Sequence, residues 1–172
     1  MNNINKKGVV EADRDGEFLS KFRKIISDIN IFSELDDGEI DELAKYLTEY
    51  SADAGVEITR EGDTEGFMCI LVKGRLEVLK HMTVQEDSKR LAIIRPGRTI
   101  GEMTLLDGLP HSATVVTSGD SVFFILTKNM FDKMNMENMA LALKIFRIIA
   151  KLVSLRLRQT NGVLVDYVRT DG

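Results

Sequence analysis

The sequence feature that most constrains this chain is the run from Ile100 to Val116, which reads IGEMTLLDGLPHSATVV. It opens on a Gly-Glu pair, continues through a segment compatible with a short helix, turns at Gly108-Leu109-Pro110 and leaves as a β-branched strand. A glycine lets the backbone approach a ligand closely, and the N–H groups at a helix start attract anions. Glu102 at the same place supplies two acceptor oxygens for hydroxyl groups. The run therefore predicts a pocket that holds an anion and a diol together.

At the far end of the run, Ser112 adds a hydroxyl and Ala113 has a small side chain that leaves its N–H accessible. The whole run resembles the phosphate-binding cassette of cyclic nucleotide-binding domains, which occur in catabolite-activator-like regulators, kinase regulatory subunits and nucleotide-gated channels. The family pattern is roughly Gly-Glu-x-x-Leu-Leu, a short turn, Pro-Arg, a small residue, Ala, Thr-Val. The matching positions here are Gly101, Glu102, Leu105, Leu106, Pro110, Ser112, Ala113, Thr114 and Val115.

The resemblance implies a binding site for a cyclic nucleotide, cAMP or cGMP. It assigns Glu102 to the ribose 2′-hydroxyl, backbone contacts to Gly101 and Met103, and phosphate-side contacts to Ser112 and Ala113. The alternative for Glu102 is a structural carboxylate bonded to backbone amides of its own turn. We expect no other cofactor and no metal, because two His and one Cys give no metal-ligand spacing.

His111 stands where the family has the Arg that pairs with the cyclic phosphate. Neutral His offers one donor where Arg offers a charged planar fork, so the exchange should cost about 1.5–3 kcal/mol, or roughly tenfold to more than a hundredfold in affinity. One interpretation keeps cyclic nucleotide binding, weakened or with His111 protonated, and predicts an affinity that tightens as pH falls through the His range. The other interpretation is that the site takes a different ligand or none.

The composition is that of an ordinary globular protein, with 44% hydrophobic and 29% charged residues in a chain of 172. The net charge of −4 argues against attraction of the whole protein to nucleic acid or an anionic membrane. A single Cys excludes an internal disulfide. Because no apolar run has the length of a membrane span or signal peptide, we expect a cytoplasmic protein without a membrane span.

The chain is predicted to form one domain between two tails. Residues 1–16 are expected to be a mobile N-terminal tail, 17–160 the domain, and 161–172 a C-terminal tail. Short strand-like runs separated by turn residues predict an antiparallel double-stranded β-helix, a jelly-roll-like β-roll of about eight strands, over about 55–127. Helices are expected at about 128–160. The fold class is thus mainly β with flanking helices.

Local signals predict two further details. Apolar residues at helical spacing from Phe18, followed by a box-like pair of Asp36 and Glu39, predict a helical lead-in to the β-roll. Lys73-Gly74 separates two strand-like runs and is interpreted as a hairpin connection.

A long helix is predicted from about Glu137 to Gln159, and it carries two neighbouring apolar stripes. One side should pack on the β-roll and the other on the same helix of a second subunit, which predicts a homodimer. The residues assigned to the dimer contact are Leu141, Ile145, Ile148, Leu152 and Leu155. The alternative is a helix buried only within its own chain. A third face with Lys144, Arg147, Lys151 and Arg158 is interpreted as solvated rather than as a nucleic-acid or lipid patch.

The function predicted from the resemblance is that of a non-catalytic regulatory module, which senses a cyclic nucleotide and couples it to the C-terminal helix and to a protein partner not identified by the sequence. No nucleophile–base or metal constellation supports an enzyme. One alternative is a scaffold of the same fold that no longer binds the nucleotide. Another is a truncated DNA-binding regulator, although the dozen residues after Thr160 could not form a helix-turn-helix domain, so no DNA binding is expected at this length.

Overall fold

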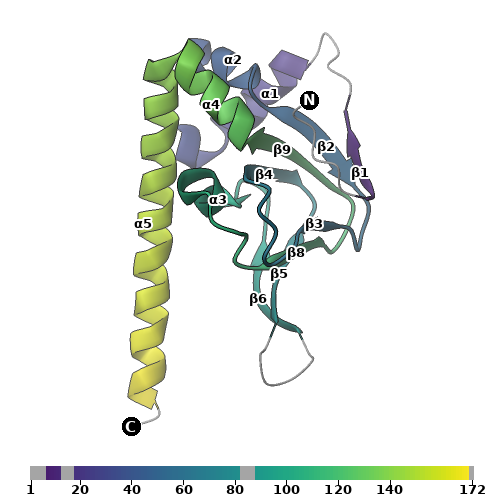
Figure 1. Ribbon diagram of the computed structural model, residues 1–172, viewed down its shortest axis with the longest axis vertical. Helices are drawn as coiled ribbons and strands as arrows, with labels where there is room; N and C mark the ends of the chain where they lie inside the picture. Colours follow the sequence, from purple (N-terminus) through teal and green to yellow (C-terminus); the bar gives the residue numbers. More distant parts are fainter. Residues whose placement is uncertain (1–6, 13–17, 82–87, 171–172) are drawn as a thin grey trace.

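The structure, a computed structural model, describes residues 7–12, 18–81 and 88–170. Two antiparallel sheets face each other (Figure 1), one of five strands in the order β1-β2-β9-β4-β7 and one of four in the order β3-β8-β5-β6. The strands are β1 (Val9–Glu11), β2 (Thr48–Ala52), β3 (Glu57–Thr59), β4 (Phe67–Lys73), β5 (Leu76–His81), β6 (Ser88–Ile94), β7 (Thr99–Ile100), β8 (Thr114–Thr117) and β9 (Ser121–Thr127). The predicted β-roll with flanking helices is confirmed.

Helices cover one end and one side of this roll. They are α1 (Phe18–Ser27), the 3-10 helix η1 (Asn30–Phe32), α2 (Asp37–Ala44), α3 (Glu102–Asp107), α4 (Lys128–Glu137) and α5 (Met139–Thr170). Figure 1 shows α1, α2 and α4 gathered at one end, while α5 runs along the whole side of the molecule. Within the described residues, no helix has the length and apolar character that a membrane crossing requires.

The lead-in helices form as their sequence predicts. One face of α1 carries side chains about one helical turn apart that are all buried: Phe18, Phe22 and Ile26. At the start of α2, the Glu39 backbone N–H donates to Asp36 Oδ1 at 2.8 Å, and the Asp36 N–H donates to Glu39 Oε2 at 2.9 Å. This reciprocal capping satisfies two backbone donors that the helix itself leaves unpaired.

The centre of the molecule is β4, a strand that is buried on both faces. Met68 and Ile70 pack with the helices, whereas Phe67, Cys69 and Leu71 pack between the sheets. Since successive side chains of a strand point to opposite faces, a strand covered on both sides requires the unbroken apolar run seen here. Burial raises the pKa of the Cys69 thiol far above its ordinary value, so Cys69 is a core residue without thiolate chemistry.

The predicted hairpin at Lys73-Gly74 is wrong. β4 pairs with β7 and β9, while β5 pairs with β6 and β8, so this connection carries the chain from one sheet to the other. Gly74 has a φ of 95°, and a Cβ on it would lie 2.3 Å from Ser121 Oγ. The glycine is therefore required by the close passage of two chain segments rather than by a two-residue hairpin turn.

Three predicted boundaries also need correction. β1 lies inside the predicted mobile tail and pairs with β2, and both strands precede the predicted start of the roll at about 55. α5 continues to Thr170, so most of the predicted C-terminal tail is helix. A single Gly162 costs about 1 kcal/mol in a helix and does not end one when no proline follows.

The apolar stripe assigned to a dimer contact lies elsewhere than predicted. Four of its five members are buried in the core of their own chain, at exposures of 0–7%: Leu141, Ile145, Ile148 and Leu152. The prediction that these four meet a second subunit is therefore wrong, since α4, α3 and η1 already cover that side of α5. The solvated face is tied to the lead-in by ion pairs of 2.5 Å, Lys144 with Glu39 and Lys151 with Glu34.

Candidate functional site

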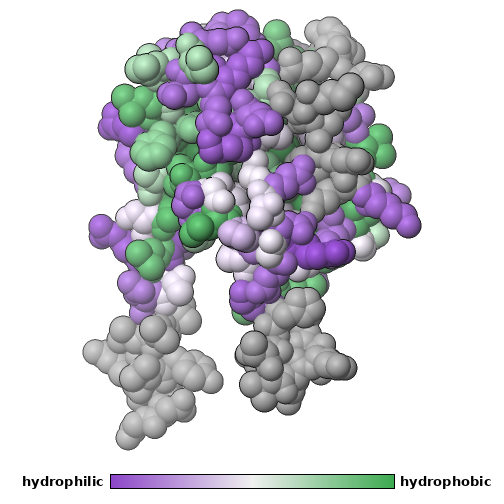
Figure 2. Space-filling model, in the orientation of Figure 1, coloured by the Kyte–Doolittle hydropathy of each residue, from purple (hydrophilic) through white to green (hydrophobic). Residues whose placement is uncertain are grey.

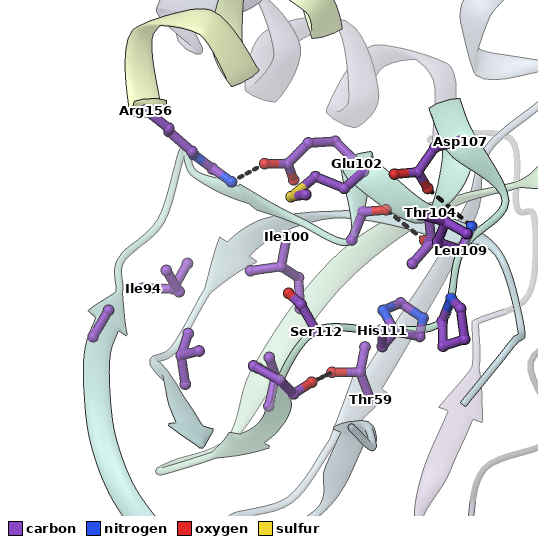
Figure 3. Close-up of a pocket in the computed structure, with 17 residues that line it drawn as sticks. Thr59, Ile94, Ile100, Glu102, Thr104, Asp107, Leu109, His111, Ser112 and Arg156 are labelled. Atoms are coloured by element: carbon purple, nitrogen blue, oxygen red, sulfur yellow. Dashed lines mark hydrogen bonds and ion pairs between the residues drawn. The ribbon is translucent and has the colours of Figure 1, made fainter. Parts of the chain in front are cut away.

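A cavity of 440 Å³ opens between the four-stranded sheet, α3 and α5 (Figure 3). Its volume is that of a small-molecule site. The six residues predicted for ligand binding, Gly101, Glu102, Met103, His111, Ser112 and Ala113, all line it. The run that the sequence singled out is thus brought to one cavity, together with residues from β5, β6 and α5.

Gly101 lies where the wall of the cavity turns from β7 into α3. It sits at a φ of 75° immediately before α3, and a Cβ there would lie 2.3 Å from the Phe67 carbonyl oxygen. Thr104 Oγ1 donates to the Gly101 carbonyl at 2.7 Å, which closes the first turn of α3. The cassette can pack against β4 in this way only with a glycine at this position.

Glu102 is the first residue of α3 and is 3% exposed. Arg156 reaches it from α5, 54 residues later, and its Nη1 donates to Glu102 Oε1 (Figure 3). The Nη2 of Arg156 donates to the Thr99 carbonyl at 2.6 Å. Within the described part of the chain, Glu102 Oε2 has no hydrogen-bond partner. A buried carboxylate oxygen without a donor is costly, so this atom is an acceptor that a ligand hydroxyl can satisfy.

Arg156 is a residue of the site that the sequence patterns did not identify. Burial, and secondly the neighbouring Arg98 guanidinium, lower the pKa of Arg156 below its ordinary value, yet an arginine stays charged in a protein. The spacing of apolar residues in the sequence does indicate that Arg156 faces the roll. Arg156 follows Leu152 by four residues and so continues the buried stripe of α5, away from the face of the other cations.

The opposite wall of the cavity is apolar. It consists of side chains from the roll interior, namely Val78, Ala92, Ile94, Ile100 and Val115. A ligand that fills the cavity therefore combines a flat or bulky apolar group with a polar group that carries hydroxyls. The charged groups of the cavity come from the cassette and α5, whereas Val78, Ala92 and Ile94 of the apolar wall come from β5 and β6.

His111 makes its contacts with neighbouring segments of the protein, through both its ring and its backbone. It is 5% exposed, its ring centroid lies 5.1 Å from that of Phe67, and its Nε2 lies 2.8 Å from the Glu65 carbonyl oxygen. Its backbone N–H donates to the Asp63 carbonyl at 2.8 Å, and its carbonyl accepts from the Gly62 N–H at 2.9 Å. These contacts brace the cassette against the 62–65 turn.

The two residues after His111 are fixed by the roll. The Ser112 carbonyl accepts from Lys80 Nζ at 2.7 Å, and the same ammonium pairs with Glu61 at 2.5 Å. The Ala113 carbonyl accepts from Thr59 Oγ1 at 3.1 Å. Both carbonyls therefore have partners, which fixes the orientation of the peptide between them at the edge of the cavity. In the described ranges, no group of three or more His, Cys, Asp or Glu side chains could hold a metal ion.

Comparisons with known proteins agree with this geometry. The profile of the family described as "Cyclic nucleotide-binding domain" matches residues 50–138, just over half of the chain. A cAMP-dependent protein kinase regulatory subunit from Yarrowia lipolytica is 28% identical over 126 residues, which are 73% of this chain but 32% of that protein. The chain thus spans about a third of the length of this relative.

Two solved structures share the fold. A cyclic nucleotide-binding domain from Methylobacillus flagellatus superposes with a TM-score of 0.80 at 22% identity, covering 93% of this chain and 89% of that one. The regulatory subunit of a cAMP-independent protein kinase A from Trypanosoma cruzi, bound to guanosine, superposes with a TM-score of 0.63 at 18% identity, covering 73% and 43%. Together with the profile match across the roll and the cassette, this shows that the chain belongs to the cyclic nucleotide-binding domain family.

Proposed function

We propose that this protein is a non-catalytic regulatory module that senses a cyclic nucleotide, cAMP or cGMP, in the 440 Å³ cavity. Glu102 carries the proposal. Its carboxylate is buried in the cavity wall, one oxygen is held by Arg156, and the other has no partner among the described residues. The ribose 2′-hydroxyl of a cyclic nucleotide would donate to that second oxygen and remove the cost of leaving it unpaired.

The rest of the cavity supports the same class of ligand. The apolar wall from β5, β6 and β8 suits a purine base, and the backbone of Ser112 and Ala113 lies where the cassette would receive the phosphate. Met103 is half exposed at the mouth and Gly101 lets the chain approach closely. The ligand roles of these residues are carried over from the resemblance of the run from Gly101 to Val115.

Coupling to α5 follows from Arg156. This residue belongs to the C-terminal helix, yet it contacts Glu102 and Thr99 in the cavity. A ligand that donates to Glu102 changes the charge distribution that Arg156 faces, so the free energy of packing α5 against the roll depends on occupancy. Such differential affinity is what a ligand needs to shift a conformational equilibrium. Hydrogen exchange along residues 150–160 with and without ligand measures this coupling directly.

Calorimetric titration with cAMP and cGMP tests the proposal. We expect binding in the micromolar range that Glu102→Gln weakens by tenfold to a hundredfold, because the substitution removes a charged acceptor. Glu77→Gln is the matched control, since Glu77 lies on β5 and pairs with Arg90 outside the cavity. Binding that survives Glu102→Gln unchanged would contradict the role of Glu102. Absence of heat with any ligand would favour a scaffold that keeps the fold alone.

An uncharged nucleoside is the second candidate ligand, and the phosphate end of the cavity favours it. Among the described residues that line the cavity, Arg156 is the one Lys or Arg, and Glu102 engages it. His111, which replaces the family Arg, directs Nε2 at the Glu65 carbonyl. The Trypanosoma cruzi relative was solved with guanosine. Adenosine and guanosine therefore belong in the same titration, and tighter binding of the nucleosides would select this candidate.

A further inference from the structure

Lys80 lies behind the edge of the cavity, where the cassette continues into β8. Its Nζ donates to the Ser112 carbonyl at 2.7 Å and pairs with Glu61 at 2.5 Å. Lys80 follows Val78 by two residues on β5, so the two side chains lie on the same face of that strand. Val78 lines the cavity, whereas Lys80 does not. A cation therefore stands directly outside the cavity wall, at the end where the family pattern has its arginine.

The contact with Lys80 fixes the direction of one peptide group. The Ser112 carbonyl and the Ala113 N–H belong to the same planar trans peptide, so they point in opposite directions. Because Lys80 holds the carbonyl from outside, the N–H is directed to the other side, toward the cavity that both residues line. Among the described residues, the Ala113 N–H donates to no backbone carbonyl. It is therefore a donor that a ligand can use.

The ion pair of Lys80 and Glu61 stands at a polar surface. The two side chains are 42% and 28% exposed, and Figure 2 shows hydrophilic and neutral residues over the part of the roll where β3, β5 and β8 lie in Figure 1. A solvated ion pair of this kind contributes little to stability. The pair of Arg90 and Glu77 is similarly exposed and lies outside the cavity. What distinguishes Lys80 is its bond to the cassette.

We propose that Lys80 is a positioning residue for the anionic part of the ligand: it orients the Ala113 N–H toward the cavity and polarises it with a charge that His111 does not supply there. This inference rests on the proposed function, since it concerns the phosphate of a cyclic nucleotide. A cation bonded to a peptide carbonyl strengthens the N–H of the same peptide as a donor, because hydrogen-bonded groups polarise one another. A bound phosphate would gain from Lys80 without touching it.

Glu61 determines how much of this charge the ligand experiences. Its carboxylate lies 2.5 Å from Lys80 Nζ and offsets the positive charge at longer range. The roll holds Glu61 in place, since its backbone N–H donates to Thr114 Oγ1 at 3.0 Å. Removal of the lysine charge and removal of the glutamate charge should therefore have opposite effects on an anionic ligand. An ion pair with a purely structural role would respond in the same direction to both substitutions.

Calorimetric titration of variants with cAMP and with adenosine, which is uncharged, tests the proposal. We expect Lys80→Met to weaken cAMP binding by about threefold to tenfold and adenosine binding by less than about twofold. Lys80→Arg should restore most of the loss, and Glu61→Gln should tighten cAMP binding by about twofold to threefold. Arg90→Met is the matched control, because it breaks the ion pair with Glu77 outside the cavity. Equal weakening of both ligands by Lys80→Met, or weaker cAMP binding in Glu61→Gln, would overturn the proposal.

Amide NMR separates a failure of this inference from a failure of the proposed function. Without ligand, Lys80→Met should shift the amide resonance of Ala113, and Arg90→Met should leave it in place. An unchanged Ala113 resonance in Lys80→Met would overturn the orienting role of Lys80, even in a protein that binds cAMP. A wild type that binds neither cAMP nor cGMP would overturn the proposed function and the ligand role of Lys80 with it, whereas the shift of Ala113 would still support the orienting contact.

Discussion

The two ends of the cavity are built on different physical principles. At the end proposed to bind the ribose, a carboxylate that is 3% exposed is held by a guanidinium from another element. At the end proposed to bind the phosphate, the side chain in the position of the family's cation is a histidine that braces the backbone through the Glu65 carbonyl. An ion pair on a buried carboxylate fixes geometry strongly and is costly to disrupt.

This difference teaches where the selectivity of the cavity lies. In the proposed binding mode, the ribose donates a hydroxyl at one place, and a ligand that lacks this hydroxyl leaves Glu102 Oε2 without a partner among the described residues. The proposed phosphate end carries no comparable requirement for an anion. We therefore expect the protein to recognise the sugar more strictly than the phosphate, and the following changes test that expectation from the largest expected effect to the smallest.

Gly101→Ala should damage both ends at once. The new Cβ would sit 2.3 Å from the Phe67 carbonyl oxygen at a φ of 75°, so we expect a loss of about 3 kcal/mol in the free energy of unfolding and loss of ligand binding. Urea unfolding measures it. Gly108→Ala is the control, since Gly108 has a similar φ of 68° but nothing within 4 Å, and it should cost about 1 kcal/mol. Equal losses would show that the close approach to Phe67 is unimportant.

Arg156→Gln should affect the ribose end alone. It would leave the Glu102 carboxylate buried without its cation, which we expect to lower the free energy of unfolding by about 2 kcal/mol, and Glu102→Gln in the same chain should restore part of the loss. Arg158→Gln, two residues along on the exposed flank, serves as the control. A double variant no more stable than Arg156→Gln would argue that the pair does not act as a unit.

His111→Arg should increase the affinity of the proposed phosphate end for an anion. An arginine restores the charged fork of the family pattern, so the affinity for cAMP should rise about tenfold relative to the affinity for adenosine. The ratio of the two dissociation constants cancels any general loss of stability from the broken contact with Glu65. An unchanged ratio would mean that this position does not reach the phosphate even when it carries a cation.

Changing pH should have the smallest effect. The sequence predicts cyclic nucleotide affinity that tightens as pH falls, but His111 Nε2 is directed at the Glu65 carbonyl, so we expect less than about a twofold change between pH 6 and 8. Adenosine, which has no phosphate, is the reference ligand in the same titrations. An affinity that tightens with falling pH for cAMP but not for adenosine would indicate that His111 contacts the phosphate, as the sequence-based hypothesis states.

What the sequence predicted well was local. The cassette is one gapless run, and its six predicted residues all line one cavity because the short helix α3 and the turn after it keep positions 101–103 and 111–113 close together. The capping pair of Asp36 and Glu39 formed for the same reason. Such features depend on neighbours within a few positions, which a single sequence displays directly.

The sequence alone could not show which segments contact each other when they lie far apart along the chain. Alternation within β4 and β5 marks both as strands but does not say that they belong to different sheets, so Gly74 was interpreted as a hairpin. The apolar character of α5 is visible in the sequence, but which of its residues pack on the roll depends on the rotation of the helix, and that is set by tertiary contacts with α3, α4 and η1. Arg156 was missed because its partner lies 54 residues earlier in the chain.

The pairing of Glu102 with Arg156 also has a consequence for how these two positions vary among related sequences. Without Arg156, Glu102 is a buried charge that lacks its counterion, so a chain that loses Arg156 is destabilised until Glu102 is replaced as well. Among descendants of this sequence, the two should be kept together or replaced together. A copy in which both have changed would lack the contact between its C-terminal helix and the cavity, and with it the coupling proposed between ligand binding and that helix.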